Sequence, residues 1–339
     1  MIGCGAVTEK KSGPALQLAC GSALSAVMSR STERAKDYAR RHGVGRYYGA
    51  VDDLLQDPEV DAVYVATPVG SHLELALRVC DHGKPAYVEK PMGRNHTECL
   101  RMRDAFRAAE LPLYVAYYRR GLPRFLKVRS LLADGAIGTL TQVNSRLSVP
   151  AHDSTSGSGA DWRLNAEQAG GGLSMDLGSH VLDIIDFLIA PLEEIRGTAR
   201  NRGRTCDVED VVSFSFRTGA TPGTGCWDFA SDVLEDLLEI RGTSGRIAIS
   251  VFRDEPIELS TEQGVQRIAI EDPVHVQQPL IQSVVDELLA RGKCPSTAET
   301  AARTNLVLDS ILDGYYGGRQ DEFWKRPGSW PGRRASSSG

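Results

Sequence analysis

A glutamate, a lysine and a proline follow a short apolar run at residues 86–88, and of all groups in the sequence these are the best placed to do chemistry. The apolar run predicts a buried parallel strand. Ligands of doubly wound α/β proteins bind just beyond the carboxyl ends of such strands, so Glu89 and Lys90 would lie beside a bound cofactor, and Lys90 would also reach a substrate. Because X-Pro bonds adopt the cis form more readily than other peptide bonds, Lys90-Pro91 is a candidate for a fixed kink that aims the lysine.

A second group lies far downstream, where a run of three glycines at 170–172 leads into Asp176 and His180. Histidine titrates near neutrality and suits acid-base chemistry, and a carboxylate on the same helix face would orient it and raise its basicity. Residues four apart share a helix face, so we expect Asp176, His180 and Asp183 to form one polar stripe. The alternative is a solvated helix face with an ion pair worth only a few tenths of a kcal/mol. No third ligand is evident, so we expect no metal.

The N-terminus resembles the turn of a dinucleotide-binding fold, in which glycines let the backbone approach a pyrophosphate. The residues expected to contact the dinucleotide there are Gly3, Gly5, Ala6 and Val7. Thr8 stands near the place of the third glycine of that fingerprint, and the alternative is an ordinary turn. Only two residues precede Gly3, so we expect the first strand to be nearly missing, as in a truncated or misassigned start.

The next strand, expected at residues 24–28, is followed by Ser29 and Arg30. Dinucleotide-binding folds that use NAD place an acidic residue here for the ribose hydroxyl, whereas an arginine accommodates the 2′-phosphate of NADP. The sequence therefore predicts NADP in preference to NAD. The alternative is a solvated arginine at the end of a strand.

Other polar and aromatic groups follow further strands. Thr67, Pro68 and His72 come after the strand expected at 62–66, and we count them with the cofactor site. Tyr118 and Arg119 follow the strand expected at 113–116, and Trp162 and Arg163 lie in a loop next to Asp161. We expect Arg119 at the cofactor and Tyr118, Trp162 and Arg163 at a polyol or carboxylate substrate. Each could equally be an aromatic core residue, a helix-terminal histidine or a solvated arginine.

The pattern of apolar runs divides the chain in two. In the first half, helical stretches at 32–42, 72–81 and 97–109 alternate with the strands, which predicts a parallel sheet, and Thr32 is the expected N-cap of the first of these helices. The second half has period-two strands at 142–147, 195–201, 211–217, 225–229, 237–241 and 246–251, a helix at 173–189, and helices at 279–290 and 298–315. The predicted fold is an α/β Rossmann domain (1–120), an α+β domain with a large open, mostly antiparallel sheet (121–322) and a partly disordered tail (323–339). The last helix is expected to pack back on the first domain.

Composition limits the function classes. The 339 residues suit about two domains, and a net charge of -5 with no basic stripe argues against a nucleic-acid partner. Seven scattered cysteines without a Cys-x-x-Cys pair fit reduced thiols in the cytoplasm. No apolar run is long enough to span a membrane, and no signal peptide is expected.

Taken together, and in their order along the chain, the glycine turn and the polar motifs described above resemble those of the Gfo/Idh/MocA oxidoreductase family. The resemblance covers nearly the whole chain, from Gly3 to about Tyr316. The motifs that carry the resemblance are Gly3-Cys4-Gly5, Ala66-Thr67-Pro68 with His72, Glu89-Lys90-Pro91, and Gly170-Gly171-Gly172 before Asp176 and His180. It implies that Lys90 contacts the nicotinamide ribose and the substrate, that His180 is the acid-base catalyst and that Asp176 assists it. It also implies a homodimer or homotetramer formed through the C-terminal sheet. The departures are Thr8 and the short first strand.

The resemblance leaves the substrate open among sugars, polyols, anhydro-sugars and dihydrodiols, each oxidised or reduced at a hydroxyl or carbonyl carbon. Two other functions stay open. One is a glycosidase of the same family that keeps its nicotinamide bound and regenerates it in each cycle. The other is a non-catalytic dinucleotide-binding sensor, which would not need Lys90, Asp176 and His180 together.

Overall fold

The computed structural model describes residues 1–150, 162–203 and 206–336 of the chain, which forms two compact units. The first unit comprises Met1–Gly93, Glu98–Leu122 and Pro273–Ala302, and the second comprises Arg94–Thr97, Pro123–Asp272 and Arg303–Gly339. Residues 273–302 thus group with the first unit, whereas the sequence-based division placed them after the boundary at residue 120. That division remains a prediction about domains.

The first unit is built on a parallel sheet, as the sequence predicts. Strands β1 (Ala26–Met28) and β2 (Arg46–Tyr48) pair with each other, and β3 (Val63–Val65), β4 (Ala86–Val88) and β5 (Leu113–Val115) form a second group, all in parallel. Ile2 makes single parallel bridges to Met28 and to Val65 and joins the two groups. The expected first strand is therefore reduced to one residue, and all strands end at the same edge.

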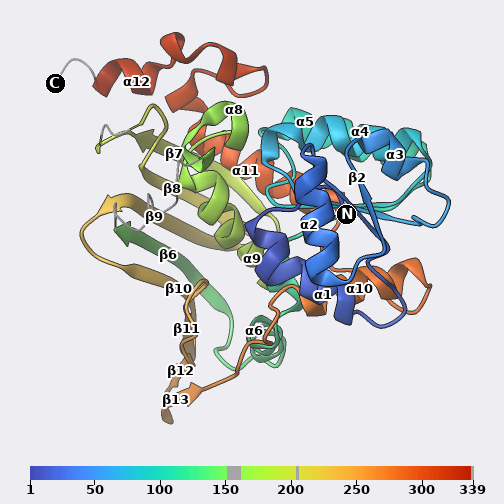
Figure 1. Ribbon diagram of the computed structural model, residues 1–339. Helices are drawn as coiled ribbons and strands as arrows, with labels where there is room; N and C mark the ends of the chain where they lie inside the picture. The colour runs from blue at the N-terminus through green and yellow to red at the C-terminus, as the bar shows by residue number, and fades with distance from the viewer. Residues whose placement is uncertain (151–161, 204–205, 337–339) are drawn as a thin grey trace. The chain divides into compact units, whose positions relative to one another are not determined.

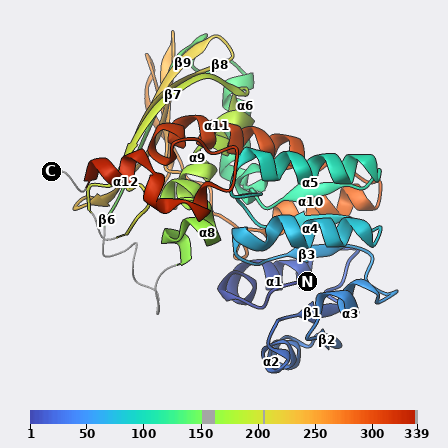
Figure 2. The same ribbon diagram turned by 90° about the horizontal axis from the view of Figure 1, so that it is seen from above.

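Helices cover both faces of this sheet. On one face α3 (Val51–Leu55), α4 (His72–Asp81) and α5 (His96–Ala108) lie in a row, and their apolar side chains share a core with the strands (Figures 1 and 2). The remaining helical segments of the unit are η1 (Thr8–Ser12), α1 (Gly13–Leu18), α2 (Thr32–His42), η2 (Val69–Ser71), η3 (Tyr118–Gly121) and α10 (Gln278–Leu288). The first residues of α11 (Ala298–Tyr316) also belong to that core.

The expected cap of α2 needs correction. Thr32 is the first helical residue, and the N-cap is Ser31, whose backbone is extended and whose Oγ accepts a hydrogen bond from the Arg34 amide at 3.3 Å. An N-cap needs the extended conformation that only the preceding residue has. At the other end Gly43 has a φ of 66°, the left-handed conformation in which many helices end.

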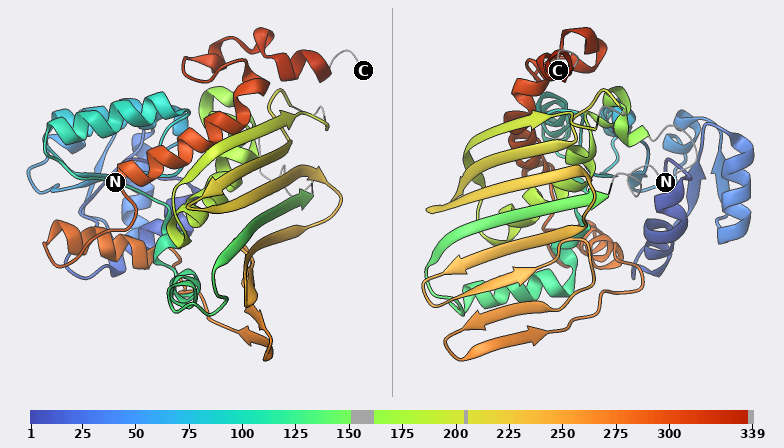
Figure 3. Two further views of the ribbon diagram at one scale, coloured as in Figure 1. Left: turned by 180° about the vertical axis from the view of Figure 1, so that it is seen from behind. Right: turned by 90° about the vertical axis from the view of Figure 1, so that its left-hand side faces the viewer.

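The second unit is built on a sheet of eight strands in the order β13-β12-β11-β10-β6-β9-β8-β7 (Figure 3). The strands are β6 (Leu140–Pro150), β7 (Leu192–Arg200), β8 (Val211–Thr218), β9 (Thr221–Ser231), β10 (Glu235–Gly242), β11 (Gly245–Ile249), β12 (Ile257–Thr261) and β13 (Gly264–Ile268). Every pair is antiparallel except β6 with β9. Six of these strands were predicted, while β12 and β13 were missed.

One face of the large sheet is apolar and the other is polar. On the inner face the rings of Phe214 and Phe216 lie over Gly225 and Gly223, which face them in the neighbouring strand. A Cβ at either glycine would lie 2.1–2.2 Å from a ring atom, so these positions exclude every other side chain. The alternate residues of β8 and β9 are exposed on the outer face.

Further helical segments complete the second unit: α6 (Pro123–Ala133), η4 (Trp162–Leu164), α8 (Ala166–Ala169), η5 (Ser174–Gly178), α9 (Ser179–Leu188), η6 (Phe323–Lys325), η7 (Pro327–Ser329) and α12 (Pro331–Ser336). In the C-terminal tail, Phe323 and Trp330 are buried and the Trp330 indole donates to the Phe323 carbonyl at 2.9 Å. The expected disorder falls partly on residues 337–339, which lie outside the described residues. Within the described residues no helix has the length and apolar character needed to cross a membrane.

We expect Gly225→Val to lower the free energy of unfolding by at least about 1–3 kcal/mol, because its side chain must displace the Phe214 ring from a packed core. Gln266→Val, at an exposed position of β13, is the control and should change stability by no more than about 0.5 kcal/mol. Urea unfolding of both variants measures the difference. Equal stabilities would contradict the packing described for this sheet.

Candidate active site

The glycine turn at the carboxyl edge of the parallel sheet depends on Gly3. Its φ is 104°, and a Cβ there would lie 2.3 Å from the carbonyl oxygen of Ala66. Gly5 has no described atom within 4 Å of where its Cβ would be, so its surface is open. Thr8, at the place of the third glycine, is buried, and its hydroxyl donates to the Gly5 carbonyl at 2.8 Å. Where the fingerprint has a glycine, the Thr8 side chain therefore bonds back to the turn and stabilises it.

A close backbone contact is present one helical turn further on. A Cβ at Gly13 would lie 2.2 Å from both the Thr8 carbonyl oxygen and the Tyr38 hydroxyl, which donates to that carbonyl at 2.9 Å. Burial raises the pKa of Tyr38 to about 12, so the hydroxyl stays a donor at neutral pH. Gly13 thus supplies the tight packing that the missing glycine supplies in the fingerprint.

The end of β1 carries two basic side chains. Ser29 is buried and Arg30 is exposed, and the described residues provide no hydrogen-bond or ion-pair partner for the Arg30 guanidinium. Arg34, four residues later, is close enough to Cys4 in the glycine turn for its charge to lower the thiol pKa, although burial dominates and raises that pKa to about 11. Arg34, in the first turn of α2, was missed in the sequence.

At the end of β4 the Glu89 carboxylate holds the backbone of Lys90. Glu89 is buried and accepts hydrogen bonds from the Tyr64 hydroxyl at 2.5 Å and the Gln277 amide at 2.9 Å. Its second oxygen accepts from the backbone amide of Lys90 at 3.1 Å. The peptide bond between Lys90 and Pro91 is cis, as expected. The buried carboxylate therefore fixes the point from which the lysine side chain leaves the sheet.

His72 is buried completely and joins two turns of the same edge. Its Nε2 lies 2.9 Å from the Thr67 carbonyl, and its Nδ1 lies 3.1 Å from the Pro91 carbonyl and 3.3 Å from that of Met92. Burial lowers the pKa of the ring. The predicted role of His72 at the cofactor is untested, and a buried ring could serve it only through the turns that carry Thr67, Pro68 and Lys90.

The segment after β5 is more buried than the sequence suggests. Tyr118 and Arg119 are exposed by 9% and 5%, and the guanidinium carbon of Arg119 lies 4.8 Å from the centre of the Tyr118 ring. All predicted cofactor residues thus come after Ile2 or after the carboxyl ends of β1, β3, β4 and β5. Since these strands are parallel, the structure brings them to one edge of the first unit.

In the second unit the glycine run leads into two helices of different pitch. The expected single helix at 173–189 is wrong in this respect, because η5 is a π-helix and α9 begins only at Ser179. Asp176 lies in the wider π turn and His180 in the first turn of α9, so the spacing of four does not define a simple α-helical stripe. Single π turns are frequent at functional sites.

Asp176 and His180 have different environments. His180 is 4% exposed and its ring meets that of Phe252 edge to face at 6.0 Å. The Asp176 carboxylate, 25% exposed, lies 3.2 Å from Nε of Arg163, and the Arg163 guanidinium also lies 5.7 Å from the Trp162 ring. The loop residues predicted for the substrate therefore join Asp176, whereas the neighbouring Asp161 lies outside the described residues.

Buried groups from distant parts of the chain support these helices. The indole of Trp227 packs on Gly178, where a Cβ would lie 2.3 Å from the ring. Glu209 accepts a hydrogen bond from the Gly172 amide at 3.1 Å and another from the Tyr316 hydroxyl, and burial raises its pKa. Sequence reasoning missed these residues because they have no local pattern. Among the described residues no group of three or more His, Cys, Asp or Glu could hold a metal ion.

The lowered pKa of His72 predicts a pH dependence of stability. Below the ordinary value of 6.5 the unfolded chain binds a proton that the folded chain does not, so stability should fall as pH drops from 7 to 5. His72→Gln removes this contribution, and its free energy of unfolding should depend less steeply on pH over that range. The exposed His82→Gln is the control and should keep the wild-type slope. Equal slopes for wild type and His72→Gln would contradict the assignment.

Comparison with known proteins gives the relatives of this chain. Residues 1–117 match the family described as "Oxidoreductase family, NAD-binding Rossmann fold", and residues 125–248 match "GFO/IDH/MocA C-terminal domain". Oxidoreductase P35 of Formosa agariphila is 33% identical over 91% of this chain and 96% of its own length. The trans-1,2-dihydrobenzene-1,2-diol dehydrogenase of Bos taurus is 30% identical over 65% of this chain and 64% of its own.

Solved structures agree in fold. Levoglucosan dehydrogenase in complex with NADH and levoglucosan has a TM-score of 0.82 at 20% identity, covering 92% of this chain and 95% of that one. An oxidoreductase from Agrobacterium radiobacter in complex with NAD+, L-tartaric acid and magnesium has a TM-score of 0.81 at 22% identity, covering 92% and 94%. At such identities the likeness concerns the fold alone.

Proposed function

This chain belongs to the Gfo/Idh/MocA family of NAD(P)-dependent oxidoreductases, and we propose that it transfers hydride at a CH-OH carbon of a sugar, polyol, anhydro-sugar or dihydrodiol. The observation that carries this proposal is the buried Glu89 carboxylate, which fixes the backbone of Lys90 at the end of β4. A rigidly held cation beside a nicotinamide site is suited to stabilise charge on a reacting oxygen.

The glycine turn fits a dinucleotide. Gly3 has a conformation that excludes a side chain and Gly5 has an open surface, so the backbone there can approach a pyrophosphate. Thr67 and Pro68 follow the adjacent strand, β3. The residues proposed to hold the cofactor are Gly3, Gly5, Ala6, Val7, Ser29, Arg30, Thr67, Pro68, His72, Glu89, Lys90 and Arg119. The bound nicotinamide supplies the hydride chemistry.

We propose that His180 accepts the proton of the substrate hydroxyl during oxidation and returns it during reduction. A buried imidazole held against Phe252 has a fixed orientation, which acid-base transfer requires. Lys90 stabilises the charge that develops on the same oxygen. Asp176, whose carboxylate is paired with Arg163, assists by its negative charge and, with Arg163, Trp162 and Tyr118, contacts the hydroxyls of the substrate.

His180→Ala should lower kcat by about 10²-fold or more, because the proton then has no positioned acceptor. The dissociation constant of NADPH should stay near that of the wild type, since the predicted cofactor residues lie in the other unit. Initial rates with a panel of sugars and dihydrodiols, together with a fluorescence titration of NADPH, measure both quantities. Near-normal turnover of the variant would rule out His180 as the acid-base group.

NADP is proposed as the preferred cofactor because Arg30 is exposed after the end of β1 and Arg34 is exposed in the first turn of the helix that follows, α2. The 2′-phosphate pairs with guanidinium groups, whereas an acidic residue would accept from a ribose hydroxyl. Solved structures of the same fold are complexes with NADH, NAD+ or NADP, so the fold leaves the cofactor open and the proposal rests on these two arginines.

Arg30→Asp should weaken NADPH binding by about 10-fold or more and improve NADH binding, because it replaces an ion pair with repulsion and adds a hydroxyl acceptor. Thermal unfolding with each cofactor measures the shift, since a ligand that binds only the folded state raises the apparent stability. Lys36→Asp, one turn along the exposed part of α2, is the charge-matched control. An unchanged NADPH preference in Arg30→Asp would contradict the proposal.

A glycosidase and a non-catalytic sensor would each give a different experimental result from a dehydrogenase. A glycosidase that regenerates its nicotinamide would keep the cofactor through purification and show product without net change in nicotinamide absorbance. A non-catalytic sensor would bind the dinucleotide without turning over any substrate. Net production of reduced nicotinamide that stops in His180→Ala supports the dehydrogenase over both. A cytoplasmic location remains a prediction from the seven cysteines.

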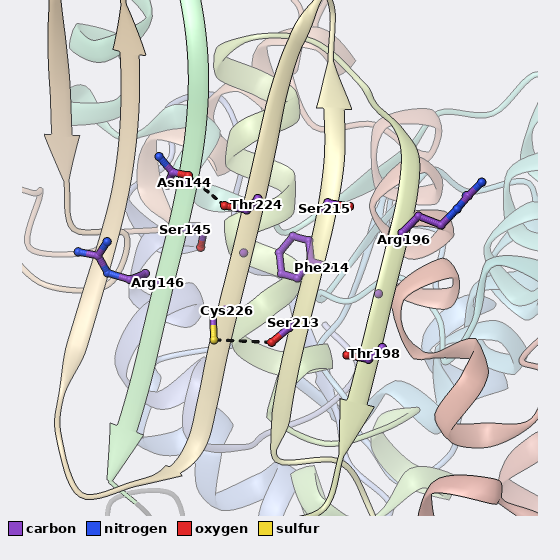
Figure 4. A pocket seen from close by; sticks show the side chains of 12 residues that line it. Asn144, Ser145, Arg146, Arg196, Thr198, Ser213, Phe214, Ser215, Thr224 and Cys226 are labelled. Carbon is purple, nitrogen blue, oxygen red and sulfur yellow. Dashed lines mark hydrogen bonds between the residues drawn. The ribbon is translucent and has the colours of Figure 1, made fainter.

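We also infer that a second copy of the chain covers the outer face of the large sheet. A shallow hollow of about 600 Å³ lies there (Figure 4). Small polar side chains of β6, β7, β8 and β9 line it, together with Arg146 and Arg196. Thr224 donates to Asn144 at 2.9 Å and Ser213 donates to Cys226 at 3.7 Å, so the face is flat and polar groups are paired within it. An open sheet face of this kind suits a symmetric contact with the same face of a second copy.

Thr224→Arg should therefore shift the protein from dimer or tetramer towards monomer, because it brings long like charges together in a symmetric contact. Light scattering after gel filtration measures the mass, and circular dichroism checks that the sheet is intact. Ala108→Arg, exposed at the end of α5, is the control and should keep the wild-type mass. A monomeric wild type would overturn the proposed interface.

A further inference from the structure

One guanidinium in the second unit is buried completely and contacts two separate stretches of backbone. Arg319, which follows α11, donates from Nε to the Asp309 carboxylate at 2.8 Å. Its Nη2 donates to the carbonyl oxygens of Arg94 and Gly170, both at 2.9 Å. Arg94 and Gly170 are far apart in the sequence, so this single group joins two chain segments.

The first of these segments is held at several further points. The second oxygen of the Asp309 carboxylate accepts a hydrogen bond from the His96 amide at 2.7 Å. The side-chain amide of Asn95 donates to the carbonyls of Arg319 at 2.7 Å and of Asp321 at 3.0 Å. Residues 94–96 are therefore held by hydrogen bonds to Arg319, to its partner Asp309 and to the following turn.

The second segment lies directly against the first. Gly170 has a φ of 81°, and a Cβ there would lie 2.6 Å from the Arg94 carbonyl oxygen and 2.7 Å from its Cα. The two backbones thus touch where the guanidinium bridges their carbonyls. Only glycine permits this approach, because both the conformation and the space exclude a side chain.

Each of the two segments adjoins residues that are proposed to take part in catalysis. Lys90 lies four residues before Arg94, and Asp176 and His180 lie six and ten residues after Gly170. We propose that Arg319, with Asp309 as its partner, is a positioning residue that ties the chain leaving Lys90 to the glycine turn leading to Asp176 and His180. This inference rests on the proposed function of those three residues.

A purely structural ion pair is the competing explanation. A buried pair is a weak source of stability, since the cost of removing both charges from water offsets most of their attraction. The rings of Tyr316 and Phe323, 4.8 and 4.2 Å from the guanidinium carbon, could support a cation anywhere in this core. The donors of Arg319 instead reach carbonyls of the two segments that adjoin the proposed catalytic groups, which favours a positioning role.

The test compares Arg319→Met, Arg319→Lys and the double variant Arg319→Met with Asp309→Leu. The double variant leaves no unpaired buried charge, so it should stay folded even if the single Met variant does not. Lysine keeps the charge but lacks the planar fork, in which Nε binds the Asp309 carboxylate while Nη2 binds the two carbonyls, so it should rescue only part of the function. Arg246→Met is the control. The Arg246 guanidinium donates to the carboxylates of Glu239 and Glu258 in the large sheet, away from both segments.

Two readouts are needed, taken well below the unfolding temperature. In the folded Met variants kcat should fall by about 10²-fold, while KM and the dissociation constant of NADPH stay within about twofold. Hydrogen exchange should accelerate both in peptides covering 91–97 and in peptides covering 168–178, with the parallel sheet of the first unit unchanged. Arg246→Met should show neither effect.

The outcomes separate this inference from the proposed function. If a destabilised but folded variant keeps its kcat, or if exchange accelerates in neither or only one segment, Arg319 is not the tie and the inference is overturned. If the wild type turns over no CH-OH substrate, the proposed function fails. The exchange experiment then still decides whether Arg319 joins the two segments.

Discussion

The parallel sheet of the first unit depends on the hydrogen bonds of Ile2. Its amide donates to the Tyr64 carbonyl and its carbonyl accepts from the Ala66 amide, both at 2.8 Å. On the other side the Gly3 amide donates to Met28 at 2.9 Å. One residue thus aligns β1 with β3, and every strand end that carries a proposed cofactor residue takes its place at the carboxyl edge from this alignment.

Buried polar groups hold the backbone at each proposed site. In the first unit Glu89 binds the amide of Lys90 and His72 joins two turns, and in the second unit Glu209 binds the amide of Gly172. Burying such groups is unfavourable unless they are hydrogen-bonded, so each defines one geometry and penalises others. The same reasoning applies to Arg319 with its two carbonyls. Chemistry that needs fixed distances is better served by such groups than by an apolar core of equal stability.

The elements that the sequence predicted are those whose burial creates a pattern. The strands β3, β4 and β5 are buried on both faces and appear as continuous apolar runs, and α2 and α4 were predicted residue for residue. The missed strand β13 is largely exposed and the missed strand β2 has no buried residue, so neither has an apolar run or a clear period-two pattern. The π turn of η5 was also missed, and its last residue, Gly178, packs against the distant Trp227, a contact that has no local pattern.

The sequence by itself determined the fold class, the family and the residue types able to do chemistry, because strand patterns, glycine turns and the Glu-Lys-Pro motif are local. Only the tertiary structure decided which groups surround those residues. Gln277 reaches Glu89 from 188 positions away, and Arg319 reaches Gly170 from 149 positions away. Such contacts arise from packing of whole elements, so the local sequence around either partner does not predict them. Local pattern therefore identifies the candidate catalytic residues, and long-range packing fixes their orientation.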